Sequence, residues 1–274
     1  MEFKSKKFTD KDGKMFHIGL GDGDVAETVL MPGDLARSKV IADCFKNAEY
    51  KGRRRTFVTY TGVTPNNEVP ITVMSSGMGC MAVSVALEEL KHLGVKNVIR
   101  VGTGAALLKD YKPGSMIIAT GAVRGDGASH EYAPAEYPAI ANHQVTSALI
   151  KACHEFGEEP IVGLYRSHDA FYRETQIVME HTYERMKDWV DAGVKMVENE
   201  SSLMFILADL LGMRAGSICV SIWSMIEGTK YYEGPPSAEA YPESFDPNFM
   251  KERIELCSKI AVRAVEILDE MDRK

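Results

Sequence analysis

The sequence lacks three features that would narrow the class of protein at once: an excess of basic residues, a long apolar run and a cysteine framework. Among its 274 residues, 32 Lys and Arg stand against 39 Asp and Glu, which gives a formal net charge of −7. A protein with this balance has no overall basic surface for nucleic acid or for an anionic membrane, so we expect neither partner. Any anion must be bound by a few cations gathered in one place.

Apolar runs are short and cysteines are few. No run approaches the about 20 residues that a membrane-spanning helix requires. The first residues, MEFKSKKFTDKDGK, include no apolar segment typical of a secretory signal. The five cysteines are odd in number and form neither a CxxC pair nor a metal-ligand spacing. These absences predict a cytoplasmic protein with reduced thiols.

Short β-rich runs alternate with amphipathic helical patterns along the chain, which favours an α/β fold with a mainly parallel central sheet. The predicted strands are residues 28–32, 56–62, 69–75, 98–101, 116–120, 161–165, 194–197 and 214–222. The predicted helices are residues 35–45, 82–93, 145–156, 177–191 and 201–211, followed by a C-terminal helix with one apolar stripe.

The sequence has no Ser-, Pro- or Gly-rich linker, no internal repeat and no block of like charge, so residues 1–274 are predicted to form one domain. One long stretch, residues 227–247 (EGTKYYEGPPSAEAYPESFDP), has no periodicity. An irregular stretch of this length inside a domain is typical of a functional lid. A surface loop without a function is the alternative.

Three glycine-containing segments follow predicted strands: MPGDLAR (31–37), SSGMGC (75–80) and IRVGTGAA (99–106). In open α/β sheets ligands bind at the carboxyl ends of the strands, where all three segments are predicted to lie. Gly33 permits a tight turn whose backbone N–H groups face the entrance of the next helix, a place that favours an anion. Tight turns without a ligand are the alternative for Gly33 and Gly77.

Arginines accompany these turns. Arg37 lies in the first turn of a predicted helix, where the helix dipole disfavours a cation, so its presence indicates an anionic ligand. Arg100 interrupts an apolar strand, and its buried charge needs a partner, either a ligand or a structural ion pair. The run Arg53-Arg54-Arg55 is a solvated cluster or a further source of guanidinium, which suits bidentate phosphate binding.

Two acidic residues mark the end of a later strand. Glu198 and Glu200, in MVENESS (196–202), stand between a predicted strand and a predicted helix, and strand alternation places both on one face. A carboxylate pair at this edge can accept hydrogen bonds from vicinal hydroxyl groups. The alternative is a capping box or a charged helix start.

Together these segments resemble the nucleoside phosphorylase-I family, and its uridine phosphorylase branch in particular. The resemblance runs from residue 16 to about residue 227, with an apparent deletion after Phe171. Besides the segments above, it rests on FHIGL (16–20), GRRRTF (52–57), ALEEL (86–90), VRGDGASHEYAPAEYPA (123–139), SHDAFY (167–172) and VENES (197–201).

The resemblance implies a three-layer α/β/α fold around a mixed, mainly parallel twisted sheet. It implies that inorganic phosphate cleaves the N-glycosidic bond of a nucleoside, uridine by default, giving free base and ribose 1-phosphate. No metal or organic cofactor is implied. The residues implied to hold phosphate are Gly33, Arg37, Arg100 and Thr103, with Arg55 contributed by a neighbouring subunit. Arg100, Thr103 and Glu200 are the implied catalytic residues.

The ribose half of the site is implied in the same way. Glu200 would bind the 2′- and 3′-hydroxyls and Glu198 would support it, while His17 would reach the 5′-hydroxyl across the subunit interface. Asn199 stands where the family usually has a Met that lines the ribose site. Phe171 would stack near the sugar and the base.

The sequence departs from the family most clearly in its base half. The Gln-x-Arg pair with which uridine phosphorylases read uracil is missing, which leaves Arg173 and Gln176 as candidates. The Asp of the purine branch is also missing, and Ile222 and Trp223 stand there instead. Leu35 replaces a usual Pro, and GTGAA (102–106) replaces a GTTGA-like run, which predicts a reshaped loop after Thr103.

Several functions therefore stay open on this fold. A purine or modified nucleoside is the rival substrate, because Phe171 and Trp223 could form a wider apolar slot. A phosphate-independent nucleosidase is a second alternative, against which the retained arginines argue, and a non-catalytic nucleoside-binding protein is a third. If His17 and Arg55 act across an interface, at least a dimer with shared sites is needed, and the family implies a hexamer.

Overall fold

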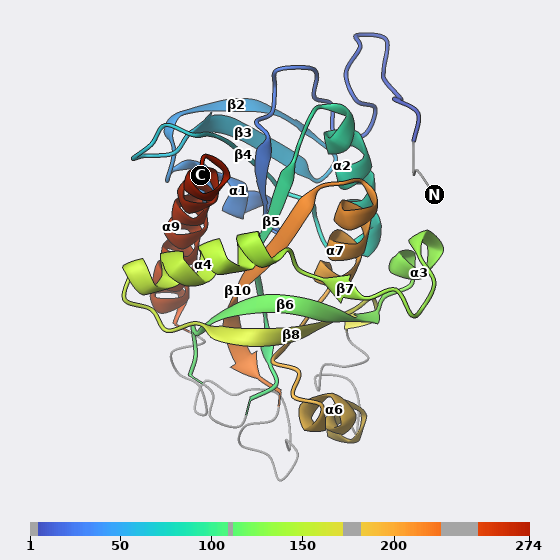
Figure 1. Cartoon of the computed structure of the whole chain (residues 1–274), viewed down its shortest axis with the longest axis vertical. Helices are drawn as coiled ribbons and strands as arrows, with labels where there is room; N and C mark the ends of the chain where they lie inside the picture. The colour runs from blue at the N-terminus through green and yellow to red at the C-terminus, as the bar shows by residue number, and fades with distance from the viewer. Residues whose placement is uncertain (1–4, 109–111, 172–181, 226–245) are drawn as a thin grey trace.

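A ten-stranded mixed sheet forms the centre of the molecule, with helices on both of its faces (Figure 1). This computed structural model describes residues 5–108, 112–171, 182–225 and 246–274. The strands are β1 (Thr28–Met31), β2 (Lys46–Arg54), β3 (Phe57–Val63), β4 (Pro70–Met74), β5 (Asn97–Ala106), β6 (Met116–Gly125), β7 (Ala139–Ile140), β8 (Ile161–His168), β9 (Met196–Glu198) and β10 (Arg214–Ser224).

Several helices begin at residues that favour such a boundary. The Asp34 side chain caps α1 by accepting the amide of Ala36 at 2.9 Å, and Asn142 caps α4 in the same way. Pro247 opens α9, where its missing N–H costs no hydrogen bond. The described helices are α1 (Leu35–Ala42), α2 (Cys80–His92), α3 (Ala128–Tyr132), α4 (His143–Glu155), α6 (Thr182–Asp191), α7 (Ser201–Leu210) and α9 (Pro247–Asp272).

Five of the strands close into a ring. The strand order is β10-β6-β8-β9-β5-β1-β4-β3-β2, and β10 also pairs with β5, so that β10, β6, β8, β9 and β5 form a closed circuit of ladders. Close approach inside this circuit requires a residue without a side chain, because a Cβ on Gly104 would lie 2.7 Å from the Val197 carbonyl oxygen. The ring therefore fixes β5 between two neighbours along its length.

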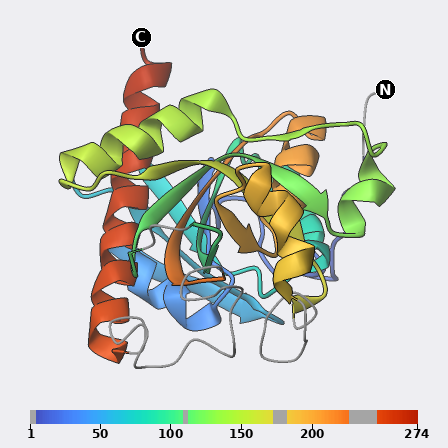
Figure 2. The ribbon, with the colours of Figure 1, turned by 90° about the horizontal axis from the view of Figure 1, so that it is seen from below.

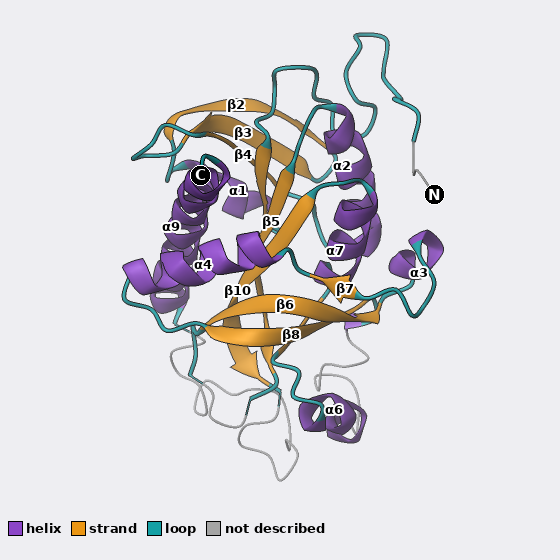
Figure 3. Ribbon diagram, viewed as in Figure 1, coloured by secondary structure: helices purple, strands orange, loops and turns teal. Residues whose placement is uncertain are grey.

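Two apolar layers cover the sheet (Figures 2 and 3). On one face, α2 and α7 pack together and bury residues such as Leu87 and Phe205. On the other face, α4 and α9 pack together, with α1 against α9, and bury residues such as Leu149 and Ile260. The predicted α/β fold with a mixed sheet between helices is thus confirmed.

Every strand and helix predicted from periodicity is present, with ends shifted by a few residues. Three described elements were not predicted: β2, the two-residue β7 and the short helix α3. β2 is polar and mostly exposed, so it carries no alternating apolar signal. The predicted turn at 102–106 is wrong, because β5 continues as a strand to Ala106. Residues 177–181 of the predicted helix, and the predicted lid up to residue 245, lie outside the described residues; Pro247 already belongs to α9.

Five parallel and five antiparallel ladders join the described strands. The longest ladders, β5 with β10 and β6 with β8, are parallel. All five cysteines are free thiols. No helix in the described ranges combines the length and the apolar character that crossing a membrane demands.

Candidate active site

Two of the three glycine segments lie at the carboxyl ends of β1 and β4, as predicted, whereas the third, residues 99–106, is part of β5 itself. Gly33 follows β1 and Gly77 follows β4, and Gly33 lies next to both Gly77 and Arg100. A Cβ added to Gly33 would lie 3.3 Å from the Gly77 carbonyl oxygen and 3.9 Å from Nη1 of Arg100. The absence of a side chain at position 33 therefore keeps open the space in front of the guanidinium.

Arg100 is held by both of the predicted acidic residues. Its Nη2 lies 2.5 Å from Oε2 of Glu200, and its Nε lies 2.8 Å from Oε2 of Glu198 without the alignment of a hydrogen bond. The residue is only 5% exposed. A structural ion pair was one of the two partners considered for Arg100, and this pair uses Nε and Nη2 and not Nη1, the nitrogen that faces Gly33.

The two carboxylates differ in their surroundings. Glu198, the last residue of β9, accepts the backbone amides of Glu200 (3.0 Å) and Ser201 (3.1 Å) and the hydroxyl of Ser167. Glu198 thus also satisfies backbone amides at the start of α7, which is the helix-capping role considered as the alternative for these residues. Glu200 accepts the amide of Gly79 at 2.7 Å and that of Asn199, and no hydroxyl donates to it among the described residues. Its carboxylate is therefore the less occupied of the two.

Burial and charge act in opposite directions on this cluster. Burial disfavours the charged guanidinium of Arg100, but Glu200 and Glu198 outweigh it, so that the pKa of Arg100 lies above its ordinary value. Burial raises the pKa of Glu200, and the charge of Arg100 offsets this only in part. Glu200 therefore takes up a proton at a higher pH than an exposed glutamate does.

This raised pKa predicts an acid limit on catalysis. The resemblance implies that Glu200 binds two sugar hydroxyls, and an ionised carboxylate is needed both for this and for pairing with Arg100, so kcat/KM should fall as the pH drops through the pKa of Glu200. The fall should start above the pKa of about 4.3 of an unperturbed glutamate. A pH profile of kcat/KM for the nucleoside, measured at saturating phosphate, checks this. Glu200→Gln should lack the limb, and a limb unchanged in that variant would assign it to another group.

Arg37 lies beside Arg100 at the mouth of this cluster. Its Nη1 donates to the Val101 carbonyl at 3.4 Å. Burial lowers the pKa of Arg37 and the nearby charge of Arg100 lowers it further. Two neighbouring cations that repel each other are stabilised by a bound anion. Thr103, three residues beyond Arg100, is half-buried on β5 beside Val220 of β10.

The amino-acid sequence is similar to a protein-family model and to several phosphorylases. A model of the Phosphorylase superfamily matches residues 27–266. The chain belongs to the phosphorylase superfamily. It is 36% identical to the uridine phosphorylase of Treponema pallidum, over 76% of this chain and 81% of that protein. It is 33% identical to the guanosine phosphorylase of Halorubrum lacusprofundi, over 93% of this chain and 99% of that protein.

A solved structure agrees with this membership. The uridine phosphorylase of Vibrio fischeri ES114 superposes with a TM-score of 0.78 at 25% sequence identity, over 93% of this chain and 98% of that one. The predicted resemblance to the uridine phosphorylase branch is thus confirmed at the level of the family.

In this phosphorylase-superfamily chain, His17 lies apart from Arg100. Its Nδ1 is 2.7 Å from Oε1 of Glu89, and the backbone amides of His17 and Ile18 donate to the same carboxylate. Glu89 is ten residues along α2 from Gly79, a rise of about 15 Å. His17 is therefore held at the opposite end of the helix from the amide that Glu200 accepts.

The arginine run divides into different roles. Arg54 pairs with Asp10 at 2.8 Å and stacks over Phe16, so it is structural. Arg55 is exposed and has a φ of 54°, a left-handed conformation that is uncommon outside glycine. Its neighbour Thr56 donates to the Ser76 carbonyl at 3.0 Å, which places Arg55 next to the glycine turn after β4.

The base half is described only in part. Ile222 and Trp223 are half-buried at the end of β10, where Trp223 packs beside a small apolar cluster that includes Ala105. Phe171, after β8, is 42% exposed. Arg173 and Gln176 lie outside the described residues.

Asn199, which stands between Glu198 and Glu200 in the sequence, is tied to the end of β8, because its side-chain amide donates to the His168 carbonyl. Sequence reasoning missed its buried neighbour Ser167, whose hydroxyl donates to Glu198, and it missed Glu89. Both lie inside segments that carry the resemblance, SHDAFY and ALEEL. Each of these two residues is a polar residue within an apolar pattern, and that interruption is the signal by which the sequence could have revealed them.

Proposed function

We propose that this chain is a nucleoside phosphorylase that uses inorganic phosphate to release the base of a nucleoside as ribose 1-phosphate forms, with uridine as the favoured substrate. One observation carries the proposal: Arg100 is held by Glu198 and Glu200 so that its third nitrogen faces Gly33, beside Arg37. An anion in this place meets two guanidinium groups, and a sugar beside it meets the carboxylate of Glu200.

The chemistry requires no covalent bond to the protein. A phosphate oxygen forms a bond to the anomeric carbon as the C–N bond breaks, and the bonding electron pair leaves with the base, which takes up a proton. Positive charge develops on the ribose ring in the transition state, when the C–N bond is largely broken and the bond to phosphate is only partly formed. Arginines that immobilise phosphate below that carbon supply proximity and electrostatic preorganisation. Glu200 holds the sugar through its hydroxyls while the base departs.

We also propose that two subunits share each site, within a homo-oligomer that the family resemblance suggests is a hexamer. Its support is the exposure of apolar residues around the site: Met78 is 87% exposed and Met81 is 72% exposed, both at the start of α2. Large exposed apolar side chains in one region indicate a covered surface. In such an oligomer, His17 and Arg55 of one subunit would complete the site of its neighbour.

Replacing Arg55 by alanine should raise the KM for phosphate roughly 10- to 100-fold, since a hydrogen bond to a charged group contributes about 1.5–3 kcal/mol. The melting temperature should change little, because the side chain is exposed. Arg53→Ala, which removes the same charge from the same cluster, is the control. An unchanged phosphate KM in Arg55→Ala would contradict the shared site.

Mixing variants tests the sharing directly. Subunits with Arg55→Ala and subunits with Glu200→Gln each give defective sites alone. A mixed dimer contains one site with an intact Glu200 from the first subunit and an intact Arg55 from the second. Co-expression should therefore restore a substantial part of the activity, and a mixture no more active than its parts would show that each site belongs to one chain.

A purine nucleoside is the second candidate substrate. Trp223 offers a large apolar surface at the end of β10, and a relative that aligns over nearly the whole chain is named guanosine phosphorylase. Phosphorolysis of uridine, inosine, adenosine and guanosine, followed by base release with and without phosphate, separates the alternatives. Base release only from purine nucleosides would overturn uridine as the favoured substrate. Base release without phosphate would indicate a nucleosidase, and nucleoside binding without base release would indicate a binding protein.

We propose that the enzyme works in the cytoplasm and needs no metal or organic cofactor. Free thiols at all five cysteines are typical of a reducing compartment. Among the described residues, no group of three or more His, Cys, Asp or Glu side chains could hold a metal ion. Dialysis against a chelator should therefore leave the phosphorolysis rate unchanged.

A further inference from the structure

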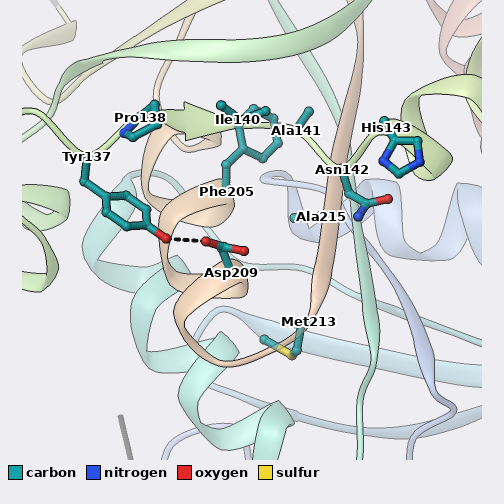
Figure 4. Close-up of a pocket in the computed structure, with 10 residues that line it drawn as sticks. All are labelled: Tyr137, Pro138, Ile140, Ala141, Asn142, His143, Phe205, Asp209, Met213 and Ala215. Atoms are coloured by element: carbon teal, nitrogen blue, oxygen red, sulfur yellow. Dashed lines mark hydrogen bonds between the residues drawn. The ribbon is translucent and has the colours of Figure 1, made fainter. Parts of the chain in front are cut away.

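A second pocket lies at the end of α7 that is remote from Arg100. It has a volume of about 500 Å³, and its lining comes from β7, the start of α4, the last turns of α7 and the start of β10 (Figure 4). Glu200 precedes α7, and Asp209, which lines this pocket, lies nine residues further on, a helical rise of about 14 Å. The pocket is therefore separate from the proposed phosphate and ribose site.

The floor of this pocket is apolar and fixed. Phe205, Met213 and Ala215 line it and are almost fully buried. Backbone hydrogen bonds hold the floor: the Met213 amide donates to the Ala208 carbonyl at 2.7 Å, and the Asn142 amide donates to the Ala215 carbonyl at 2.8 Å. A preformed apolar floor within this range of volume is typical of a small-molecule site.

Two polar side chains of the pocket, Tyr137 and Asp209, meet each other, and Asn142 and His143 lie across the pocket from them (Figure 4). Tyr137 donates its hydroxyl to Oδ2 of Asp209, as Figure 4 shows. This hydrogen bond raises the pKa of Tyr137, as expected for a phenol that donates to an ionised carboxylate. No lysine or arginine is among the described residues that line the pocket; Asp209 is the one carboxylate among them and His143 the one histidine.

Asp209 retains acceptor capacity for a ligand. Its Oδ1 has no hydrogen bond within the described ranges, and each carboxylate oxygen accepts more than one donor. A carboxylate accepts two parallel N–H groups best, as it does from a guanidinium. Asn142 uses its side-chain oxygen to cap α4, which leaves its amide nitrogen as the donor that it can offer.

We propose that this pocket binds a flat heteroaromatic ligand that carries adjacent N–H and NH₂ donors, the pattern of an aminobenzimidazole or of the donor edge of guanine. The donors bind Asp209, and the ring lies over Phe205 and Met213, with the Met sulfur against the ring. Ile140, which is 63% exposed at the rim, covers the outer face of the ring. No part of this assignment depends on the proposed phosphorolysis.

Calorimetry with 2-aminobenzimidazole as the probe tests the proposal on the intact protein. The probe should bind with the same affinity in the absence and in the presence of saturating phosphate and uridine. Asp209→Asn should weaken binding at least 10-fold, and 2-methylbenzimidazole, which has the same ring without the NH₂ group, should bind at least 10-fold more weakly to the unaltered protein. Glu136→Gln, a matched charge change outside the pocket lining, should leave affinity unchanged.

Three results would overturn the assignment. The first is the absence of binding, and the second is binding that Asp209→Asn does not change. The third is displacement of the probe by phosphate or uridine, which would move it to the other site. A change in oligomeric state in Ile140→Ser, together with no probe binding, would assign the surface to a subunit contact instead. Loss of phosphorolysis alone, with probe binding intact, would count only against the proposed function.

Discussion

Replacing Arg100 by methionine should lower kcat/KM for phosphorolysis about 10³-fold, the upper range for the loss of one preorganised charge-stabilising donor. It should also destabilise the fold by about 3–5 kcal/mol, because removing one partner of a buried ion pair leaves an uncompensated charge. Here two carboxylates, Glu198 and Glu200, lose the same partner. Steady-state kinetics and urea unfolding measure the two effects.

Arg37→Met is the matched control for this prediction. The substitution removes a second guanidinium from the proposed anion site but leaves the two buried carboxylates paired with Arg100. Among the described residues, Nη1 of Arg37 donates only to the backbone carbonyl of Val101. Activity should therefore fall with a much smaller loss of stability. If Arg100→Met unfolded at the same urea concentration as the unaltered protein, the ion pair would contribute nothing to the fold. If it retained phosphorolysis, Arg100 would not bind phosphate.

Replacing Glu200 by glutamine should lower kcat/KM for a ribonucleoside about 10²-fold. Glutamine keeps the shape of the side chain, but it loses the charge that faces Arg100 and one of the acceptors for the sugar hydroxyls. The KM for phosphate should change much less, because Arg37 and Arg100 both remain. Steady-state kinetics in which the nucleoside and phosphate are varied in turn give kcat/KM for the nucleoside and the KM for phosphate separately.

A pair of substrates makes this prediction specific. The unaltered enzyme should prefer a ribonucleoside to its 2′-deoxy counterpart, because the deoxy sugar leaves an acceptor of Glu200 unpaired. In Glu200→Gln that preference should shrink. A preference of unchanged size would mean that another residue recognises the 2′-hydroxyl, even if the overall rate had fallen.

The residues that meet around Arg100 could be picked out from the sequence because each interrupts or bounds a local pattern. Arg100 interrupts an apolar strand, and Gly33 stands between a strand and a helix. Glu198 and Glu200 could be placed on one face because strand alternation is a local rule. Their common contact with Arg100, about a hundred residues away in the sequence, is not local, and only the register of β5 against β9 supplies it.

The rest could not be predicted for equally physical reasons. The closed ring depends on β10 pairing with both β5 and β6, and periodicity carries no record of which strands become neighbours. The exposed strand β2 has no apolar face to reveal it. The contact of His17 with Glu89 joins residues 72 apart in the sequence, and a single charged residue in a helix pattern is normally solvated. The predicted base contacts at Arg173 and Gln176 fall outside the described residues.

The closed ring separates what can change in this enzyme from what cannot. Arg100 pairs with β1 on one side and β10 on the other, so a shift of this residue would break pairing on both sides, and Thr103 pairs with Val220 of β10. Of the described candidates for base contact, Phe171 follows the end of β8, whereas Trp223 belongs to β10 and pairs with Ala105 of β5. In the proposed enzyme, substitutions beyond the end of β8 can therefore change the contacts near the base, while the ladders of β5 keep the proposed phosphate residues Arg100 and Thr103 in register.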